Sequence, residues 1–233
     1  MRRGLTISLF LFAFVSSTMA QTSRVEEAIK QIPIAGHVVE DFVPKGWVLY
    51  EKASGDLNRD RLADAALTIT LPYEEADKLK ESGDYKGAPN IVIVLFGKRG
   101  GGFTRFAVNG KLYPEDGDSR SYMSPSIKNG VLALNNNWGD VTATDVTYRF
   151  RYNAATKKLM LIGFDFEEYS RANNNDGSRS SENYVTGMVV MYTKFRSSES
   201  NDYQEIKRAF AGTAKVAFEE TVIRSREYGR APF

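Results

Sequence analysis

The sequence predicts an α+β fold in which a mainly antiparallel β-sheet is accompanied by a short N-terminal helix and a C-terminal helix. Short apolar and aromatic runs recur between clusters of turn-forming residues, as is typical of strands. In one of these runs Arg149 and Arg151 alternate with aromatic residues, so one face of the sheet is expected to be in water, which favours antiparallel pairing. Two segments near the ends of the chain show helical spacing instead.

The N-terminal helix is expected to begin at the capping box Ser23–Glu26 and to end before Pro33. A second stretch of helical composition covers Glu74–Ser82 and is closed by Gly83. Strands are expected in four apolar runs of this half of the chain: Gly46–Tyr50, Ala65–Leu71, Ile91–Phe96 and Phe103–Val108. The last two are joined by the glycine-rich segment Gly97–Gly102, which is typical of a hairpin turn.

The second half of the chain contains four further predicted strands: Val131–Leu134, Val146–Tyr152, Leu159–Phe166 and Tyr184–Tyr192. The C-terminal helix is predicted over Asn201–Ala211, because Tyr203, Ile206 and Phe210 recur at helical spacing and Gly212 follows. No Pro- or Ser-rich linker divides the chain. We therefore expect one domain.

Residues 1–20 have the pattern of a secretory signal peptide. Two arginines precede an apolar stretch from Leu5 to Val15, and small residues lead up to Ala20. We expect cleavage after Ala20, which leaves residues 21–233 as a single α+β domain in the periplasm or outside the cell. No later uncharged run approaches the ~18 residues that a transmembrane helix needs, so no membrane-spanning segment is expected after signal removal.

Composition excludes several kinds of site. The chain has no cysteine and one histidine, His37, which excludes disulfides, thiolate chemistry and metal sites built from two or more histidines of one chain. The 31 Lys and Arg exceed the 29 Asp and Glu by two, and the signal peptide contains two arginines. A neutral mature chain argues against nucleic-acid binding, which depends on surplus positive charge.

One segment, residues 56–64, has the spacing of a cation-binding loop. Asp56, Asn58, Asp60 and Asp64 supply side-chain oxygens at positions 1, 3, 5 and 9, and the backbone carbonyl of Leu62 can join them at position 7. A tight loop can turn such side chains around a hard cation that takes six to eight oxygen ligands. A donor set without nitrogen or sulfur suits calcium and disfavours transition metals.

The segment Lys52–Leu67, which contains "GDLNRDRLAD", resembles the calcium loop of FG-GAP/VCBS-type repeats. The chain also resembles small exported bacterial proteins that carry one such segment followed by a hydrophobic hairpin, a "YRFRY…LIGFD" stretch (here Tyr148–Tyr152 and Leu161–Asp165) and a "SxNYxTG" segment (here Ser181–Gly187). The resemblance implies that Asp56, Asn58, Asp60 and Asp64 are calcium ligands. It implies no reaction.

Two features qualify this resemblance. Position 6 of such loops is normally glycine because the backbone turns through positive φ there, and this chain has Arg61, at a cost of about 1 kcal/mol. The alternative is a turn in which Asp and Asn side chains bind nearby backbone amides without a metal. The loop occurs once, whereas a propeller would need several copies. If calcium binds, its dissociation constant should be about 10⁻⁴–10⁻³ M.

Asp165 and Glu167 are weak catalytic candidates at the end of a predicted strand. Strand alternation places both carboxylates on one face, about 6.6 Å apart along the chain, near the spacing of glycosidase carboxylates. Acidic residues at a strand end more commonly face water. The Gly97–Gly102 segment contains Lys98 and Arg99 but lacks the phosphate-loop motif, so it is expected to be a hairpin tip.

The expected function is therefore a calcium-stabilised binding or interaction module of the bacterial envelope or exterior, with an unknown protein or glycan as its ligand and with structural Ca²⁺ as its cofactor. The alternatives are an envelope polysaccharide hydrolase that uses Asp165 and Glu167, and an inhibitor or immunity-type protein. No catalytic constellation is recognisable in the sequence, so a non-enzymatic role is favoured over an enzymatic one.

Overall fold

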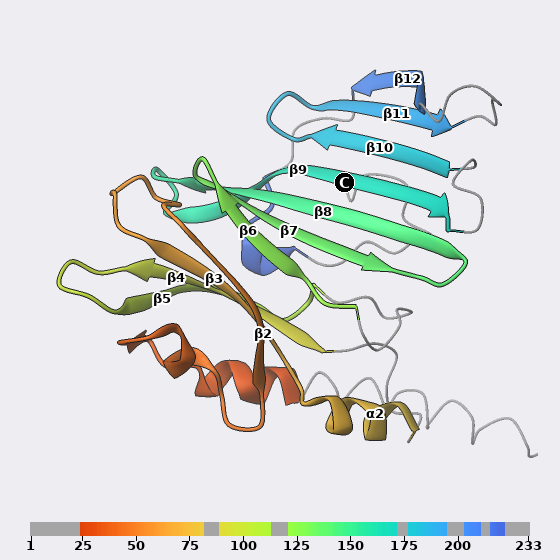
Figure 1. The fold of residues 1–233 in the computed structure, drawn as a ribbon. Helices are drawn as coiled ribbons and strands as arrows, with labels where there is room; N and C mark the ends of the chain where they lie inside the picture. Colours follow the sequence, from red (N-terminus) through yellow and green to blue (C-terminus); the bar gives the residue numbers. More distant parts are fainter. Residues whose placement is uncertain are drawn as a thin grey trace, which may run out of the picture.

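The computed structural model describes residues 24–81, 89–112, 121–171, 177–194, 203–210 and 215–221. These residues form two antiparallel β-sheets that share a hydrophobic core, with short helices around them (Figure 1). The mainly antiparallel α+β fold expected from the sequence is confirmed. Among the helices that the structure describes, none is long and apolar enough to cross a membrane.

The first sheet has five strands in the spatial order β1-β5-β4-β3-β2. They are β1 (Ala35–Gly36), β2 (Val48–Gly55), β3 (Asp64–Thr70), β4 (Asn90–Gly97) and β5 (Phe103–Asn109). Every residue of β3 is buried, as are the first six residues of β4. This burial arises because both faces of the central strands are covered.

The second sheet has seven strands in the order β12-β11-β10-β9-β8-β7-β6, which is simply their order along the chain. They are β6 (Ser124–Lys128), β7 (Val131–Trp138), β8 (Thr142–Asn153), β9 (Lys158–Ser170), β10 (Gly177–Asn183), β11 (Met188–Lys194) and β12 (Tyr203–Phe210). This sheet is a meander, in which each strand pairs antiparallel with its neighbours in sequence.

Two hydrophobic clusters lie on opposite faces of the five-stranded sheet. On one face, Leu67 and Ile93 pack with residues of the N-terminal helix (residues 24–31) and with Phe42 of the 3₁₀ helix η1 (Val39–Phe42). On the other face, Val92 and Val94 pack against the seven-stranded sheet. The alternation of side chains along each strand sends neighbouring residues to the two clusters.

A second 3₁₀ helix, η2 (Phe218–Glu220), closes part of the core between the sheets. Phe218 is fully buried, and its ring meets that of Phe150 edge-on at a centroid distance of 5.1 Å. The buried side-chain amide of Asn109 donates hydrogen bonds to the carbonyl oxygens of Phe218 and of Thr221. Residues 218–221 are thereby fixed to β5 and β8.

Most of the predicted elements are present. The four strands expected in the first half correspond to β2, β3, β4 and β5, and the glycine-rich segment is the β4–β5 hairpin turn. The helix expected at Glu74–Ser82 is α2 (Tyr73–Glu81). A helix covers residues 24–31 as expected, although Ser23 of the predicted capping box lies outside the described residues.

The predicted C-terminal helix is wrong. Residues Tyr203–Phe210 form strand β12, which is antiparallel to β11 with Phe210 opposite Met188. The helical spacing of a few apolar residues is a local signal, whereas strand formation here depends on backbone pairing with a partner strand elsewhere in the sequence.

The strand predicted over Tyr184–Tyr192 is correct only in its second part. Residues 184–187 form the β10–β11 turn, in which the Asn183 side-chain oxygen accepts hydrogen bonds from the backbone N–H groups of Val185 and Thr186, each at 3.0 Å. Strands β6 and β10 were not expected, because their polar sequences lack the apolar alternation that predicts a strand.

Candidate functional site

The loop at residues 56–64 joins β2 to β3, and Gly55, the last residue of β2, pairs with Asp64, the first residue of β3. The carboxylate of Asp56, at position 1, accepts hydrogen bonds from the backbone N–H groups of Arg59 (2.6 Å) and Arg61 (2.9 Å). Asp56 therefore stabilises the turn by accepting one backbone N–H on each of its carboxylate oxygens.

Asn58 and Asp60, at positions 3 and 5, repeat this arrangement. The Asn58 side-chain oxygen accepts the backbone N–H of Asp60 at 3.0 Å, and one Asp60 oxygen accepts the backbone N–H of Leu62 at 2.8 Å. The Asn58 amide also donates to the other Asp60 oxygen at 3.0 Å. The side chains at positions 1, 3 and 5 thus fold back onto the loop that carries them.

The backbone of this loop adopts the left-handed conformation at two residues that are not glycine. Arg61 has φ 68°, so the positive φ expected at position 6 is confirmed, and Arg59 has φ 65°. Each such residue costs roughly 1–2 kcal/mol relative to the right-handed region. The N–H groups of these same two residues donate hydrogen bonds to the Asp56 carboxylate, and these bonds offset part of the conformational cost.

Asp64, at position 9, is the fully buried member of the set. Its two carboxylate oxygens accept the backbone N–H of Leu57 at 2.8 Å and that of Gly97 in β4 at 2.9 Å. Burial raises the pKa of Asp64, and the nearby charge of Asp60 raises it further, while the backbone hydrogen bonds act in the opposite direction. Asp64 therefore joins the loop to the interior of the five-stranded sheet.

The chemistry of the donor set fits a hard cation. Three carboxylates, one amide and the Leu62 carbonyl are all oxygen donors, and a carboxylate oxygen that accepts one N–H retains a lone pair for a second contact. The described residues contain no group of three or more His, Cys, Asp or Glu side chains that could hold a metal by themselves. The structure therefore does not bring Asp56, Asp60 and Asp64 together as such a group, and a cation in this loop would need Asn58 and the Leu62 carbonyl as well.

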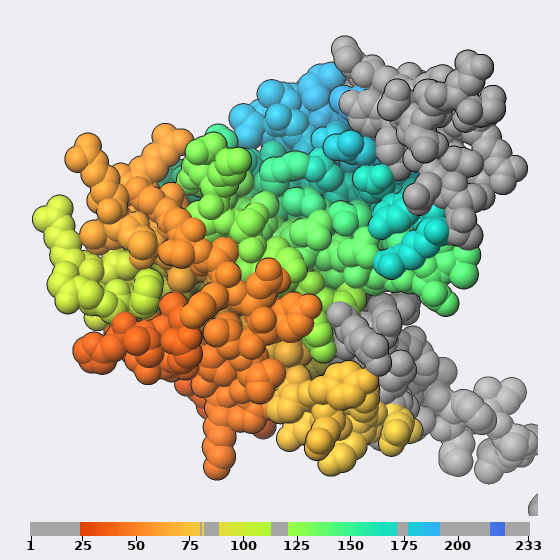
Figure 2. Space-filling view, viewed as in Figure 1, coloured from red at the N-terminus to blue at the C-terminus, as the bar shows by residue number. Residues whose placement is uncertain are grey.

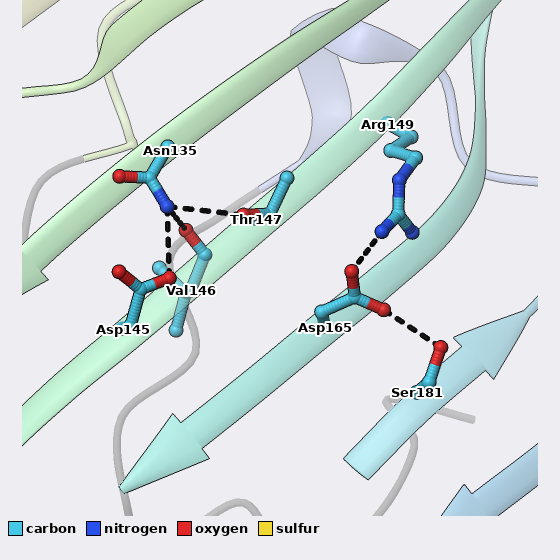
Figure 3. Close-up of polar contacts among 7 residues, drawn as sticks. All are labelled: Asn135, Asp145, Val146, Thr147, Arg149, Asp165 and Ser181. Atoms are coloured by element: carbon cyan, nitrogen blue, oxygen red, sulfur yellow. Dashed lines mark hydrogen bonds and ion pairs between the residues drawn. The ribbon is translucent and has the colours of Figure 1, made fainter. Parts of the chain in front are cut away.

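Asp165 and Glu167, the weak catalytic candidates, both lie in β9 on the face of the seven-stranded sheet opposite the core. Asp165 forms an ion pair with Arg149 of β8 and accepts a hydrogen bond from the hydroxyl of Ser181 in β10 at 2.7 Å (Figure 3). A Cβ on the neighbouring Gly163 would lie 3.0 Å from the carbonyl oxygen of Glu182 in β10 and 3.3 Å from an Arg149 nitrogen, so glycine allows the close approach of both. An ion pair stabilises the ionised carboxylate, so Asp165 is poorly suited to act as a general acid.

The same face contains Asp145, which no sequence motif marks as a site residue. It is directly opposite Glu167 in the β8–β9 pairing, and it accepts hydrogen bonds from the side-chain amides of Asn135 (2.8 Å) and Asn137 (3.4 Å) (Figure 3 shows the first). Burial raises the pKa of Asp145, and the charge of Glu167 adds to this effect, while the two amides lower it. The signal for this cluster was the run of three asparagines at 135–137, since asparagine is depleted in strands.

The sequence matches no protein-family model, and neither the curated proteins nor the solved structures include a match to this chain.

Proposed function

We propose that residues 56–64 hold a structural Ca²⁺ and that the protein is an exported, calcium-stabilised binding or interaction module of the bacterial envelope or exterior. The observation that carries the proposal is the approach of two proposed ligands, the Asn58 amide and the Asp60 carboxylate, to 3.0 Å of each other in a loop with left-handed backbone at Arg59 and Arg61. The hydrogen bonds from backbone N–H groups to Asp56, Asn58 and Asp60 are common to this loop and to a turn without a metal. The resemblance of Lys52–Leu67 to FG-GAP/VCBS-type calcium loops supports the same assignment.

Asp56, Asn58, Asp60, the Leu62 carbonyl and Asp64 would be the ligands. A divalent cation beside Asp60 and Asp64 would offset the repulsion that contributes to the raised pKa of Asp64. It would also favour the left-handed backbone that the loop requires. Bound calcium stabilises a fold by about 2.7 kcal/mol when its concentration is 100 times the dissociation constant.

The location of the loop explains why such an ion would be structural. Asp64 binds the backbone of β4 through Gly97, and the Ser54 hydroxyl donates to the Asp64 carbonyl at 3.1 Å. An ion held by the loop would therefore stabilise the contacts that join β2, β3 and β4. Its removal should lower the stability of the whole five-stranded sheet rather than loosen one exposed turn.

A second candidate function is hydrolysis of an envelope polysaccharide on the outer face of the seven-stranded sheet. The observation that favours it is a carboxyl group with a raised pKa, Asp145, opposite a second carboxyl group, Glu167. A general acid needs a raised pKa, and glycosidases use two carboxyl groups. This candidate pairs Glu167 with Asp145, in place of the Asp165 expected from the sequence.

The experiment that tests the preferred function is thermal unfolding of the mature chain in calcium and in EDTA. We expect EDTA to lower the melting temperature and added calcium to restore it. Asp60→Ala should abolish the difference, whereas Asp140→Ala, which removes an exposed aspartate from the β7–β8 turn, should preserve it. Equal melting temperatures for the wild type in calcium and in EDTA would refute the calcium assignment.

A further inference from the structure

Among the turns that lie at one end of the two sheets are four between successive strands: residues 56–63, 98–102, 129–130 and 154–157. Within each sheet, antiparallel pairing places the alternate turns at one end. Figure 1 shows the β2–β3 loop, the β4–β5 turn and the turns of β6–β7 and β8–β9 on the left side of the molecule.

Contacts between the sheets show that the two sets of turns are neighbours. A Cβ placed on Gly130, in the β6–β7 turn, would lie 3.4 Å from the Arg59 side chain of the β2–β3 loop. Phe96 and Phe106, beside the β4–β5 turn, pack edge-on against Tyr152, which precedes the β8–β9 turn, at centroid distances of 5.5 and 5.6 Å. The four turns therefore form one continuous end of the molecule.

This end is rich in exposed positive charge. Six exposed cations, which we call the basic end, are Arg59, Arg61, Lys98, Arg99 and Lys157 of the turns and Lys128, the last residue of β6. Lys158, which follows the β8–β9 turn, is also exposed but is paired with Glu220. The three ion pairs between described residues involve none of these six side chains. The acidic residues of the four turns are Asp56 and Asp60, whose carboxylates bind the loop's own backbone.

The concentration of charge is unexpected in a chain whose acidic and basic residues nearly balance, at 29 against 31. A chain that is close to neutral and places six exposed cations, none of them in an ion pair with another described residue, at one end has a strongly polarised surface. Such a surface attracts an anionic partner and orients the molecule toward it.

We propose that the basic end docks on the surface of a bilayer that contains anionic phospholipid. The proposal names the partner of the interaction module proposed above, and depends on that proposed function only for its location at the envelope. The complementary chemistry is a layer of lipid phosphates facing a layer of arginine and lysine side chains.

The distribution of the six cations favours a flat partner over a single polymer strand. Five of them are carried on separate turns of both sheets and Lys128 ends strand β6, and the β2–β3 loop and the β4–β5 turn project from the body of the molecule in Figure 2. Projecting tips can reach a plane together, whereas a linear polyanion is bound more completely by cations that line a groove. Gly100, Gly101 and Gly102 add no side chains to the β4–β5 tip, so its Lys98 and Arg99 can approach headgroups closely.

Calcium in the adjacent loop would strengthen this attraction. Asp56 and Asp60 are the negative charges among the four turns, and a divalent cation held between them would offset their effect on an approaching anion. The six cations are nevertheless present without the ion, so membrane binding and calcium binding can succeed or fail independently.

The test is co-sedimentation of the mature chain with vesicles of equal parts phosphatidylglycerol and phosphatidylcholine, in parallel with vesicles of phosphatidylcholine alone. We expect binding to the anionic vesicles only, and loss of that binding at high salt, because exposed charges are screened over about 3 Å at 1 M ionic strength. The assay is run in calcium and in EDTA, and calcium binding is measured separately.

The decisive comparison uses two variants of equal net charge. Lys98→Gln/Arg99→Gln/Lys157→Gln removes three cations from the basic end, and Lys30→Gln/Lys45→Gln/Lys78→Gln removes three exposed lysines from other parts of the surface. The first variant should bind anionic vesicles about a hundredfold more weakly, at about fivefold for each cation lost. The second should bind more weakly than the wild type by less than about tenfold.

Equal binding by the two variants would overturn the proposal, as would failure of the wild type to bind anionic vesicles at low salt. If the wild type binds dextran sulfate but not the vesicles, the partner is a soluble polyanion and the bilayer assignment is wrong. If vesicles bind in EDTA while calorimetry detects no calcium, the inference stands and the calcium assignment fails.

Discussion

The carboxylate of Asp64 accepts a hydrogen bond from the backbone N–H of Gly97 at 2.9 Å and joins the first residue of β3 to the last residue of β4. Gly97 can approach so closely because it has no side chain: a Cβ there would lie 2.4 Å from the carbonyl oxygen of Ala63. The other Asp64 oxygen accepts the N–H of Leu57. One buried carboxylate therefore fixes the β2–β3 loop to the neighbouring strand.

Asp64→Asn should destabilise the protein by about 1–3 kcal/mol, because one side-chain oxygen is replaced by an amide that cannot accept the N–H it faces. Either Leu57 or Gly97 then has a buried donor without an acceptor. Urea unfolding in EDTA measures this effect without a contribution from calcium. Asp140→Asn, on the exposed β7–β8 turn, should change the free energy of unfolding by less than about 0.5 kcal/mol. If the two variants were equally stable, the structural role of Asp64 would be refuted.

Arg61→Gly should stabilise the calcium-free protein by about 0.5–1 kcal/mol relative to Arg61→Ala, because glycine adopts the observed φ of 68° without the steric cost borne by alanine. The comparison with alanine removes the contribution of the arginine side chain. Chemical denaturation of the two variants measures the difference. A less stable glycine variant would contradict the left-handed conformation at this position.

Asp145 should make the stability of the wild type fall as pH rises. Its pKa is raised above the ordinary value of 3.8, so the folded state binds a proton more readily than the unfolded state does. The contribution of protonated Asp145 to the free energy of unfolding is fully present below pH 3.8 and is lost as pH rises through the raised pKa of the folded state. Asp145→Asn should remove it, so the stability of the variant relative to the wild type should increase over that interval. Urea unfolding across a pH series tests this expectation, and a constant difference between the two proteins would contradict it.

Arg149→Ala should destabilise the seven-stranded sheet by about 1–3 kcal/mol, because it removes the ion-pair partner of the partly buried Asp165 carboxylate. The double variant Arg149→Ala/Asp165→Ala should lose less than the sum of the two single variants, since each single change leaves a polar group without its partner. Chemical denaturation of the wild type, the two single variants and the double variant gives the coupling free energy between Arg149 and Asp165. Strict additivity would show that the pair contributes nothing to stability.

The sequence was most informative where the structural signal is local. The run Ile91–Phe96 predicts β4 because a continuous apolar strand must be buried on both faces. Likewise, the oxygen donors of residues 56–64 are spaced so closely that only a tight loop can accommodate their mutual hydrogen bonds. The positive φ at Arg61 also follows from the motif, although arginine itself gives no indication of it.

Features that depend on distant pairing were missed. Strand β12 exists through its backbone pairing with β11, and the helical spacing of its apolar residues conceals this. The contact of Asn135 with Asp145 requires the register of β7 against β8, and the position of Glu167 opposite Asp145 requires that of β8 against β9. Composition and spacing do not determine strand register. The asparagines therefore indicate a polar face, but they do not predict which residues meet on it.

The measurement that tests the central claim most directly is isothermal titration calorimetry of Ca²⁺ into the metal-free mature chain and into its Asp60→Ala variant. We predict binding of one ion by the wild type with a dissociation constant of about 10⁻⁴–10⁻³ M, and no binding by the variant. Absence of heat for the wild type at millimolar calcium, or equal heats for the two proteins, would contradict the assignment of residues 56–64 as a calcium loop.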